Sequence, residues 1–208
     1  MKKSIIILLM AVLFITGCGK SKTKKDIIKI DNGGWTYKES TNGNYLSYAV
    51  NIKNNDSKKN ATNIKLTIIG LDDKKKEIFK YEDEIGNLSK KESTSYGKTI
   101  KVTSKPSNVK FKISSDKTDK EILSLNDIKI SNLKDEKKDS MIKITGTIDN
   151  RGKDINKLLV SVIFKKDKKI IGGTFTNIYL IKSNQQFEIY FDDILEYDDY
   201  EIKSLFME

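Results

Sequence analysis

Two stretches of strictly alternating apolar and polar or small residues lie 96 positions apart in this chain. Each stretch runs into an asparagine, Asn54 in the first and Asn150 in the second. Alternation with a period of two is typical of a half-buried β-strand and does not fit a helix. The repetition predicts that one strand-built unit occurs twice. The alternating positions are Leu46, Tyr48, Val50 and Ile52 in the first copy and Ile142, Ile144, Gly146 and Ile148 in the second.

The match between the two copies continues along the chain. A second alternating stretch, a charged turn and a later apolar position recur in the same order. We therefore expect about six or seven short strands in each copy and no convincing helical segment. The matched features are Ile64, Leu66 and Ile68 with Val160, Val162 and Phe164; the turns at 72–76 and 165–169; and Leu88 with Leu180, at a shift of 92.

This pattern predicts an all-β fold with two β-sandwich domains in tandem. The first sandwich is expected at residues 26–114 and the second at 125–208. Residues 115–124 are polar and are expected to form a linker between them, or a short helical turn.

The order of features resembles the small immunoglobulin-like modules of bacterial surface lipoproteins, particularly the FxLYD type. In that pattern a strand ending in Asn is followed by a second strand, a Phe-x-Leu-Tyr-Asp turn with a charged tip, and a later strand containing Phe. The first copy keeps Leu71 and Asp73 of the turn, and the second keeps Asp167. Phe187 and Phe191 fit the later strand. The resemblance implies two immunoglobulin-like β-sandwiches and supplies no catalytic residues.

Residues 1–17 have the parts of a bacterial lipoprotein signal in the required order. Lys2 and Lys3 precede an apolar run at 5–15, which is too short for a transmembrane helix of about 20 residues but suits a signal-peptide core. The following Ile-Thr-Gly-Cys resembles a lipobox. The resemblance implies a signal helix that is cleaved after Gly17 and a diacylglyceryl group on the sulfur of Cys18. The alternatives are an ordinary secretory signal in which a cysteine stands by chance, and a retained transmembrane helix.

An acylated Cys18 would make the lipid bilayer the first partner of this protein. Two acyl chains give a lasting anchor, and lysines next to the anchor add attraction to anionic headgroups. We therefore expect residues 18–25 to be a lipidated tether on the extracytoplasmic face of the cell membrane of a Gram-positive bacterium. The basic residues of this tether are Lys20, Lys22, Lys24 and Lys25.

Composition argues against several classes of function. The net charge is +10, but Arg151 is the one arginine among 39 basic residues, which disfavours specific nucleic-acid binding because bidentate base contacts depend on arginine. The chain has no histidine, which removes Ser-His-Asp and Cys-His nucleophiles and imidazole metal sites. No phosphate-binding or dinucleotide-binding glycine motif is present. We expect no cofactor and no catalytic residues.

One dense acidic cluster lies near the C-terminus. Carboxylate oxygens suit hard cations, which makes the aspartates weak candidates for metal ligands, although the spacing is not that of an EF-hand. The alternative is a solvated turn between two edge strands. The tyrosines among these acids could recognise a sugar or a basic peptide, or close the core. The candidate ligands are Asp192, Asp193, Asp198 and Asp199, and the tyrosines are Tyr190, Tyr197 and Tyr200.

These observations predict a membrane-anchored lipoprotein that acts as a non-catalytic binding module of the cell envelope, with an envelope protein or a wall polymer as its partner. The alternatives are a passive spacer or accessory subunit, and an enzyme that uses carboxylates alone. A pocket with convergent carboxylates would favour the enzyme, and an exposed aromatic patch would favour the binding module. Smooth charged faces would favour the spacer.

The lipidation hypothesis predicts that Cys18→Ser abolishes labelling of the protein by a clickable fatty acid. The physical reason is that the serine hydroxyl replaces the thiol to which the lipid is attached. Labelling in growing cells, followed by gel fluorescence and cell fractionation, checks this, and the protein should also leave the membrane fraction. Label incorporation that is equal in Cys18→Ser and the unaltered protein would contradict the assignment.

Overall fold

The computed structural model describes residues 26–138, 141–192 and 195–207. Cys18, the leader and the tether lie outside these ranges. The described chain is almost entirely β, as the alternation predicted, and within it no helix is long and apolar enough to cross a membrane. The elements are β1 (Ile28–Ser40), β2 (Gly43–Asn54), β3 (Asn60–Leu71), β4 (Glu77–Leu88), β5 (Ser93–Val102), β6 (Asn108–Thr118), the short 3-10 helix η1 (Leu125–Asp127), β7 (Ile128–Lys138), β8 (Met141–Asn150), β9 (Ile155–Lys166), β10 (Lys169–Ile181), β11 (Gln185–Asp192) and β12 (Asp199–Phe206).

The order of the first six strands in their sheets is repeated by the last six. β1-β2-β5 form a three-stranded antiparallel sheet, and β7-β8-β11 form another with the corresponding order. The remaining strands form one sheet in the order β10-β9-β12-β4-β3-β6. Its two halves, β10-β9-β12 and β4-β3-β6, again consist of corresponding strands in the same order. The pairing of Phe206 in β12 with Asn87 in β4 joins the two halves. We call β1–β6 the first repeat and β7–β12 the second.

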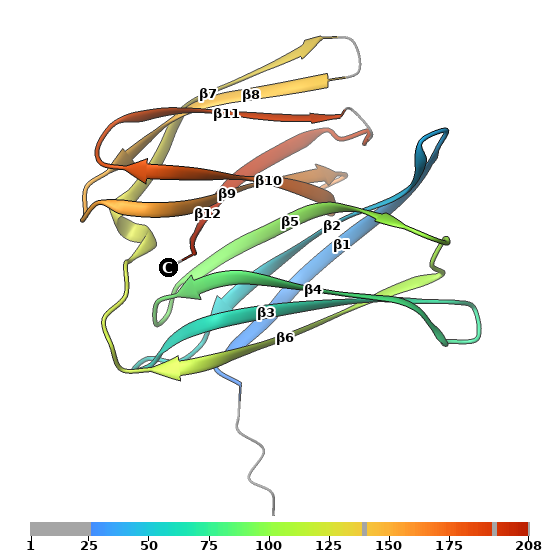
Figure 1. Ribbon diagram of the computed structural model, residues 1–208, viewed down its shortest axis with the longest axis horizontal. Coiled ribbons are helices and arrows are strands. Elements are labelled where there is room, and N and C mark those ends of the chain that lie inside the picture. The colour runs from blue at the N-terminus through green and yellow to red at the C-terminus, as the bar shows by residue number, and fades with distance from the viewer. Residues whose placement is uncertain (1–25, 139–140, 193–194, 208) are drawn as a thin grey trace, which may run out of the picture.

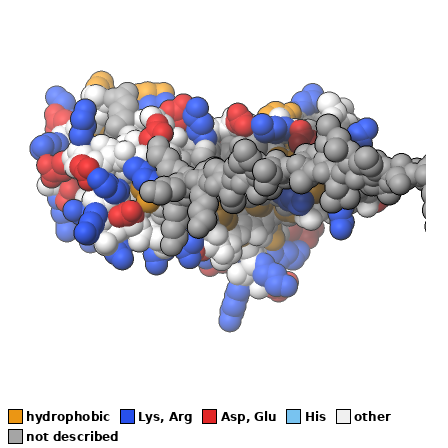
Figure 2. Space-filling model, turned by 90° about the horizontal axis from the view of Figure 1, so that it is seen from below, with side chains coloured by type: hydrophobic (Ala, Val, Ile, Leu, Met, Phe, Trp, Pro, Cys, Tyr) orange, Lys and Arg blue, Asp and Glu red, His pale blue; other side chains and the backbone are white. Residues whose placement is uncertain are grey.

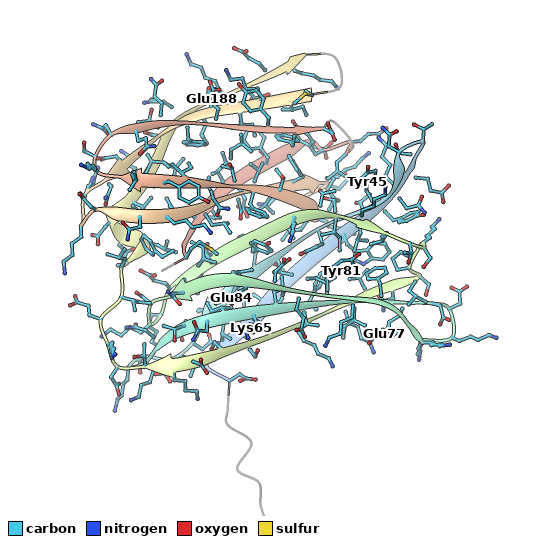
Figure 3. All side chains as sticks on the ribbon, viewed as in Figure 1. Tyr45, Lys65, Glu77, Tyr81, Glu84 and Glu188 are labelled. Carbon is cyan, nitrogen blue, oxygen red and sulfur yellow. The ribbon has the colours of Figure 1, made fainter. Side chains whose placement is uncertain are left out.

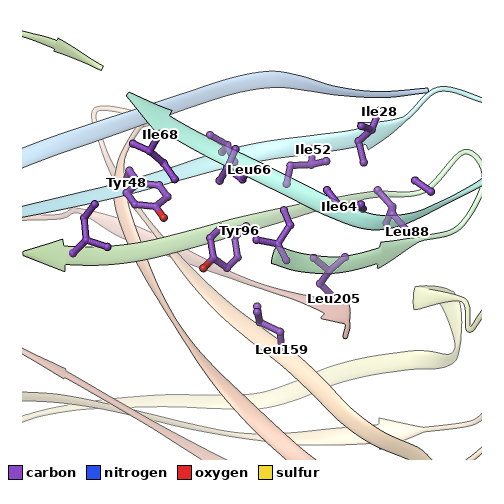
Figure 4. Close-up of a cluster of buried hydrophobic side chains, with 14 of the residues drawn as sticks. Ile28, Tyr48, Ile52, Ile64, Leu66, Ile68, Leu88, Tyr96, Leu159 and Leu205 are labelled. Carbon is purple, nitrogen blue, oxygen red and sulfur yellow. The ribbon is translucent and has the colours of Figure 1, made fainter. Parts of the chain in front are cut away.

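The sheets of the two repeats are stacked in four layers, as Figure 1 shows. One hydrophobic core lies inside each repeat, built from the alternating positions that the sequence analysis identified. Tyr48, Ile52 and Leu66 are at most 1% exposed in the first core, which also takes in Leu159 and Leu205 of the second repeat (Figure 4). The cores of the two repeats are therefore in contact.

The two repeated asparagines have the same structural role. The buried side-chain amide of Asn54 donates hydrogen bonds to the carbonyls of Lys59, at 3.1 Å, and Leu88, at 3.2 Å. The amide of Asn150 donates to the carbonyl of Ile181 at 3.2 Å. Each asparagine thus ties the end of the second strand of its repeat to the end of the fourth, and satisfies a carbonyl that burial has removed from water.

The predicted match between Leu88 and Leu180 is wrong by one residue. Ile181 is the structural counterpart of Leu88, because both are buried and both accept the hydrogen bond of the repeated asparagine. Leu180 has a left-handed backbone, with φ of 56°, and its side chain is 70% exposed. This local twist turns Leu180 outward, where the sequence pattern places an inward side chain.

The second repeat docks onto the first through the edge strand β10, which contacts β1, β2 and β5. The Ser47 hydroxyl accepts from the backbone N–H of Gly173 at 3.1 Å, and Thr99 donates to the Gly173 carbonyl at 3.2 Å. Thr36 donates to the carbonyl of Ile171 at 2.8 Å. Hydroxyls of one sheet therefore satisfy backbone groups on the edge of another, which would otherwise be buried without partners.

Glycines allow this close approach. A Cβ atom on Gly97 would lie 2.7 Å from the Cα atom of Gly173, closer than real Cβ contacts allow. A Cβ on Gly34 would overlap the carbonyl of Ile170. The contact between the repeats is thus formed by backbone against backbone, and any side chain at Gly97 has to push the sheets apart.

The segment between the repeats is held by a half-buried glutamate. β6 ends at Thr118 and η1 begins at Leu125. Glu92, in the turn before β5, accepts hydrogen bonds through Oε1 from the Ser124 hydroxyl at 2.5 Å and from the Leu125 N–H at 2.9 Å. This carboxylate attaches the connecting chain to the first repeat.

A polar cluster bridges the two sheets of the first repeat. Tyr48 donates a hydrogen bond to Asp83 at 2.5 Å, and the Lys98 ammonium contacts the same carboxylate at 2.5 Å. The ring of Tyr96 lies 6.4 Å from that of Tyr48. Burial, together with the negative charge of Asp83, raises the pKa of both phenols above the ordinary value of 10.0.

The raised tyrosine pKa values predict a loss of stability in alkali. Unfolded tyrosines titrate near pH 10, whereas the native phenols keep their protons to higher pH. The stabilisation is therefore complete below pH 10, and the free energy of unfolding falls as pH rises further, by up to about 1.4 kcal/mol per pH unit for each phenol. Urea denaturation between pH 9 and 11 measures this slope. Tyr48→Phe should reduce the slope by the contribution of one phenol, and Tyr179→Phe, at a ring that is 58% exposed, is the control that removes no buried phenol. An equal slope in Tyr48→Phe and the unaltered protein would exclude the explanation.

The close contact between the repeats predicts that Gly97→Ala is destabilising by about 1–3 kcal/mol, because the added methyl group meets backbone atoms. Gly152→Ala is the matched control, since a Cβ there faces the Asp127 side chain at 3.1 Å in an exposed turn. Its effect should stay within about 0.5 kcal/mol. The denaturation midpoints of the two variants measure the difference. Equal midpoints would show that the two sheets can move apart to fit the methyl group without a loss in the free energy of unfolding.

Candidate binding groove between the repeats

The groove begins on the outer face of the β1-β2-β5 sheet, which faces the second repeat. Residues that are directly opposite in antiparallel strands share a face, so cross-strand pairing groups the outward side chains into rows. From one row to the next, the side chains grow from small to long. The rows are Gly34, Ala49 and Gly97; then Thr36, Ser47 and Thr99; then Lys38, Tyr45 and Lys101.

This gradient in size decides where the groove opens. The two rows of small residues lie under β10, where the glycine contacts and the hydroxyl hydrogen bonds are formed. The third row carries side chains that are too long for such a contact. The β1–β2 hairpin turn lies close to the second repeat, and Tyr45 lies beside this turn, as Figure 3 shows. The sheets separate at this row and leave a hollow.

The hollow has a volume of about 580 Å³, within the range of about 300–1,000 Å³ that is usual for small-molecule sites. One wall comes from each repeat. The first repeat contributes Lys38, Ser40, Asn42, Tyr45, Thr99 and Lys101, and the second contributes Phe164, Thr174, Tyr190, Phe191, Asp192, Leu195 and Tyr197.

The wall of the second repeat is built on an aromatic cluster. The ring of Phe164 lies 4.8 Å from that of Phe191 and 4.9 Å from that of Tyr197. Tyr197 contacts Tyr200 edge to face, with 6.3 Å between the ring centroids. These distances are typical of favourable aromatic pairs. The wall is therefore a packed aromatic cluster.

Tyr190 lies at the margin of the groove, and its ring lies on the outer face of the β7-β8-β11 sheet, where 55% of the residue is exposed. Its hydroxyl donates to Glu188 at 2.6 Å, and the ammonium of Lys143 lies 5.7 Å from the ring centroid. Lys143 also forms an ion pair with Glu188 at 2.6 Å, and this contact lowers the pKa of the Glu188 carboxyl below its ordinary value. Charged neighbours thus hold the ring on the outer face, whereas the next residue, Phe191, faces the core and the groove.

Tyr200 lies behind this wall, outside the groove lining. Its hydroxyl donates to Asp135 at 3.2 Å. Partial burial, followed by the charge of Asp135, raises the pKa of Tyr200 to about 12. Of the three tyrosines that the sequence analysis selected, Tyr190 and Tyr197 line the groove and Tyr200 supports it.

The candidate metal ligands separate in the structure. Asp192 lines the groove, and Asp193 lies outside the described residues. Asp198 accepts from the backbone N–H of Asp167 at 2.8 Å, in the β9–β10 turn, and Asp199 accepts from the adjacent N–H of Tyr200. Among the described residues, no three acidic groups come close enough to hold a metal ion.

The strands around this acidic segment differ from the expectation in one respect. β11 is an edge strand, but β12 lies inside the six-stranded sheet, between β9 and β4. The expectation of two edge strands is therefore wrong for β12. The pairing of β12 with β4 depends on how the repeats are stacked, which the local pattern of residues does not reveal.

No motif in the sequence marks the wall that the first repeat contributes. Lys38, Tyr45 and Lys101 come from three different strands, and pairing alone brings them into one row. In the sequence, these three residues are marked only by their place at polar positions of stretches in which polar and apolar residues alternate. Many surface lysines have the same property.

Comparison with known proteins assigns no family to this chain. No protein-family model matches it. A search of curated proteins finds no matching relative.

Proposed function

We propose that this protein is an exported lipoprotein, anchored through Cys18 to the extracytoplasmic face of the membrane, and that it acts as a non-catalytic binding module of the cell envelope. The groove between the repeats is its binding surface. The observation that carries the proposal is an open hollow with tyrosines on both walls, formed where two repeats meet. Aromatic residues with a few polar groups around them are typical of binding sites.

We infer further that each repeat is an immunoglobulin-like β-sandwich. The β1-β2-β5 sheet and the β4-β3-β6 half of the six-stranded sheet enclose one core, and the same order recurs in the second repeat. The paired sheets and the shared core support a sandwich. The stacking of one sandwich on the other provides a surface that neither repeat has alone.

The position of the groove supports a role in presentation. β1 begins at Ile28, close to the proposed tether, and reaches the groove at Lys38. Ten strand residues at about 3.4 Å each place the groove roughly 35 Å along the molecule from that end. Figure 1 shows β1 running through the first repeat toward the β11 side of the molecule. A tether at residues 18–25 would thus hold the protein by the end opposite to the groove.

The charges around the groove favour binding over hydrolysis. Among the described lining residues, Asp192 is the one carboxylate. Glycoside hydrolysis without histidine requires two carboxylates that flank the scissile bond. The lining instead combines two lysines with tyrosines and hydroxyl groups, which suits recognition of a ligand and gives no acid–base pair.

A passive spacer is the second candidate, and one observation favours it. The face shown in Figure 2 carries lysine and carboxylate side chains of both signs interspersed, with small hydrophobic areas between them. Such a surface keeps a protein soluble and does not select a partner. A spacer would use the stacked repeats for length alone and leave the groove unused.

Photo-crosslinking in intact cells separates these two functions. A photoreactive phenylalanine derivative replaces Tyr45 in the groove or, as a control, Tyr179, which is 58% exposed but does not line the groove. A binding module should give a discrete crosslinked partner or polymer from position 45 and little from position 179. Crosslinks at neither position would favour the spacer, and crosslinks from position 179 alone would place the binding surface elsewhere.

A further inference from the structure

The row of Lys38, Tyr45 and Lys101 gives the groove a charge preference. The two lysines stand on either side of the tyrosine, on neighbouring strands of one sheet face. Both are exposed, and neither forms an ion pair with a carboxylate in the described part of the chain. Lys98 and Lys143 differ in this respect, since each is paired with an acid. The groove thus holds two ammonium groups whose charge is not neutralised.

A glycine helps to position one of these ammonium groups. Gly43 follows the β1–β2 turn with φ of +126°, a conformation that side chains rarely adopt. A Cβ atom at this position would collide with the end of the Lys101 side chain, 3.0 Å from its Nζ atom. The absence of a side chain at Gly43 therefore leaves room for the Lys101 ammonium beside the hairpin.

The opposite wall supplies a different chemistry. Phe191 and Tyr197 contribute two rings from the packed aromatic cluster. Ser40, Asn42 and Thr174 add hydroxyl and amide groups at the margins. Rings that receive an apolar face, next to groups that exchange hydrogen bonds, match a sugar ring, which has C–H groups on its faces and hydroxyls at its edge.

We propose that the groove binds an acidic glycan, a chain of sugar units that carries carboxylate or phosphate groups. This inference rests on the proposed binding function and names its ligand. The tyrosines contact the sugar faces, and Lys38 and Lys101 attract the acidic groups. Among the described lining residues, the two positive charges of Lys38 and Lys101 outnumber the one negative charge, which is on Asp192. A basic peptide is disfavoured, because the unpaired lysines would repel it.

The test measures binding of matched acidic and neutral glycans to the full chain in mild detergent by titration calorimetry. A hyaluronan hexasaccharide against chitohexaose tests for carboxylate, and mannopentaose phosphate against mannopentaose tests for phosphate. We expect at least one acidic member to bind about tenfold more tightly than its neutral partner at low salt, and this preference to shrink as salt screens the lysines. If the preference appears in the hyaluronan pair, the groove recognises carboxylate; if it appears in the mannopentaose pair, the groove recognises phosphate.

Two double variants test the residues. Lys38→Gln with Lys101→Gln should reduce the affinity for the acidic glycan to that for the neutral one. Lys110→Gln with Lys112→Gln removes the same charge from exposed positions on β6, outside the groove, and should leave the preference intact. Tyr45→Ala should weaken binding of acidic and neutral glycans by a similar factor, because it removes a contact with the sugar face.

Equal affinity for acidic and neutral glycans would overturn the proposal, as would equal losses in the two double variants. Binding of no glycan would also overturn it. If position 45 then still crosslinks to a protein in cells, the binding function stands and the ligand class is wrong. If position 45 crosslinks to nothing, the binding function fails as well.

Discussion

The docking of β10 on the β1-β2-β5 sheet is the contact on which the rest of the structure depends. An edge strand carries backbone groups that need partners, and here the hydroxyls of Ser47 and Thr99 provide them at Gly173. The glycine contact between Gly97 and Gly173 lets the strand approach closely enough for these hydrogen bonds. The same contact joins the repeats and covers an edge that would otherwise be open to aggregation. It also determines which part of the sheet face stays free.

The free part of that face is the site. Along the sheet, rows of glycine and alanine, then of threonine and serine, lie under β10, and the row of Lys38, Tyr45 and Lys101 lies beyond it. A close contact between backbones cannot continue over long side chains, so the sheets part where this row begins. The groove is thus a direct consequence of side-chain size along three strands. Its tyrosines, its unpaired lysines and its place at the far end of β1 follow from the same arrangement.

Local pattern predicted much of the fold because the alternation reflects burial. The inward residues of β2 and β8, and the asparagines that end them, have the places that the repeat indicated. The match failed by one residue at Leu180, where a left-handed backbone turns the side chain outward. The outward residues were harder to interpret, since a polar position that faces water and one that faces another sheet look alike in sequence. Tyr190 and Asp192 were found because aromatic and acidic residues cluster there, whereas Lys38 and Lys101 give no such signal.

The amino-acid sequence by itself determined the all-β class, the repetition of one unit and the buried face of the central strands, because burial imposes a period of two on a strand wherever it lies. It also carries the whole basis for the proposal of a lipid anchor at Cys18. Only the tertiary structure decided that the repeats stack face to face, that β12 lies inside a sheet, and that Lys38, Tyr45 and Lys101 meet an aromatic wall from the second repeat. These features depend on pairing and packing between segments that are far apart in the chain, and the side-chain period of one strand contains no information about its neighbours.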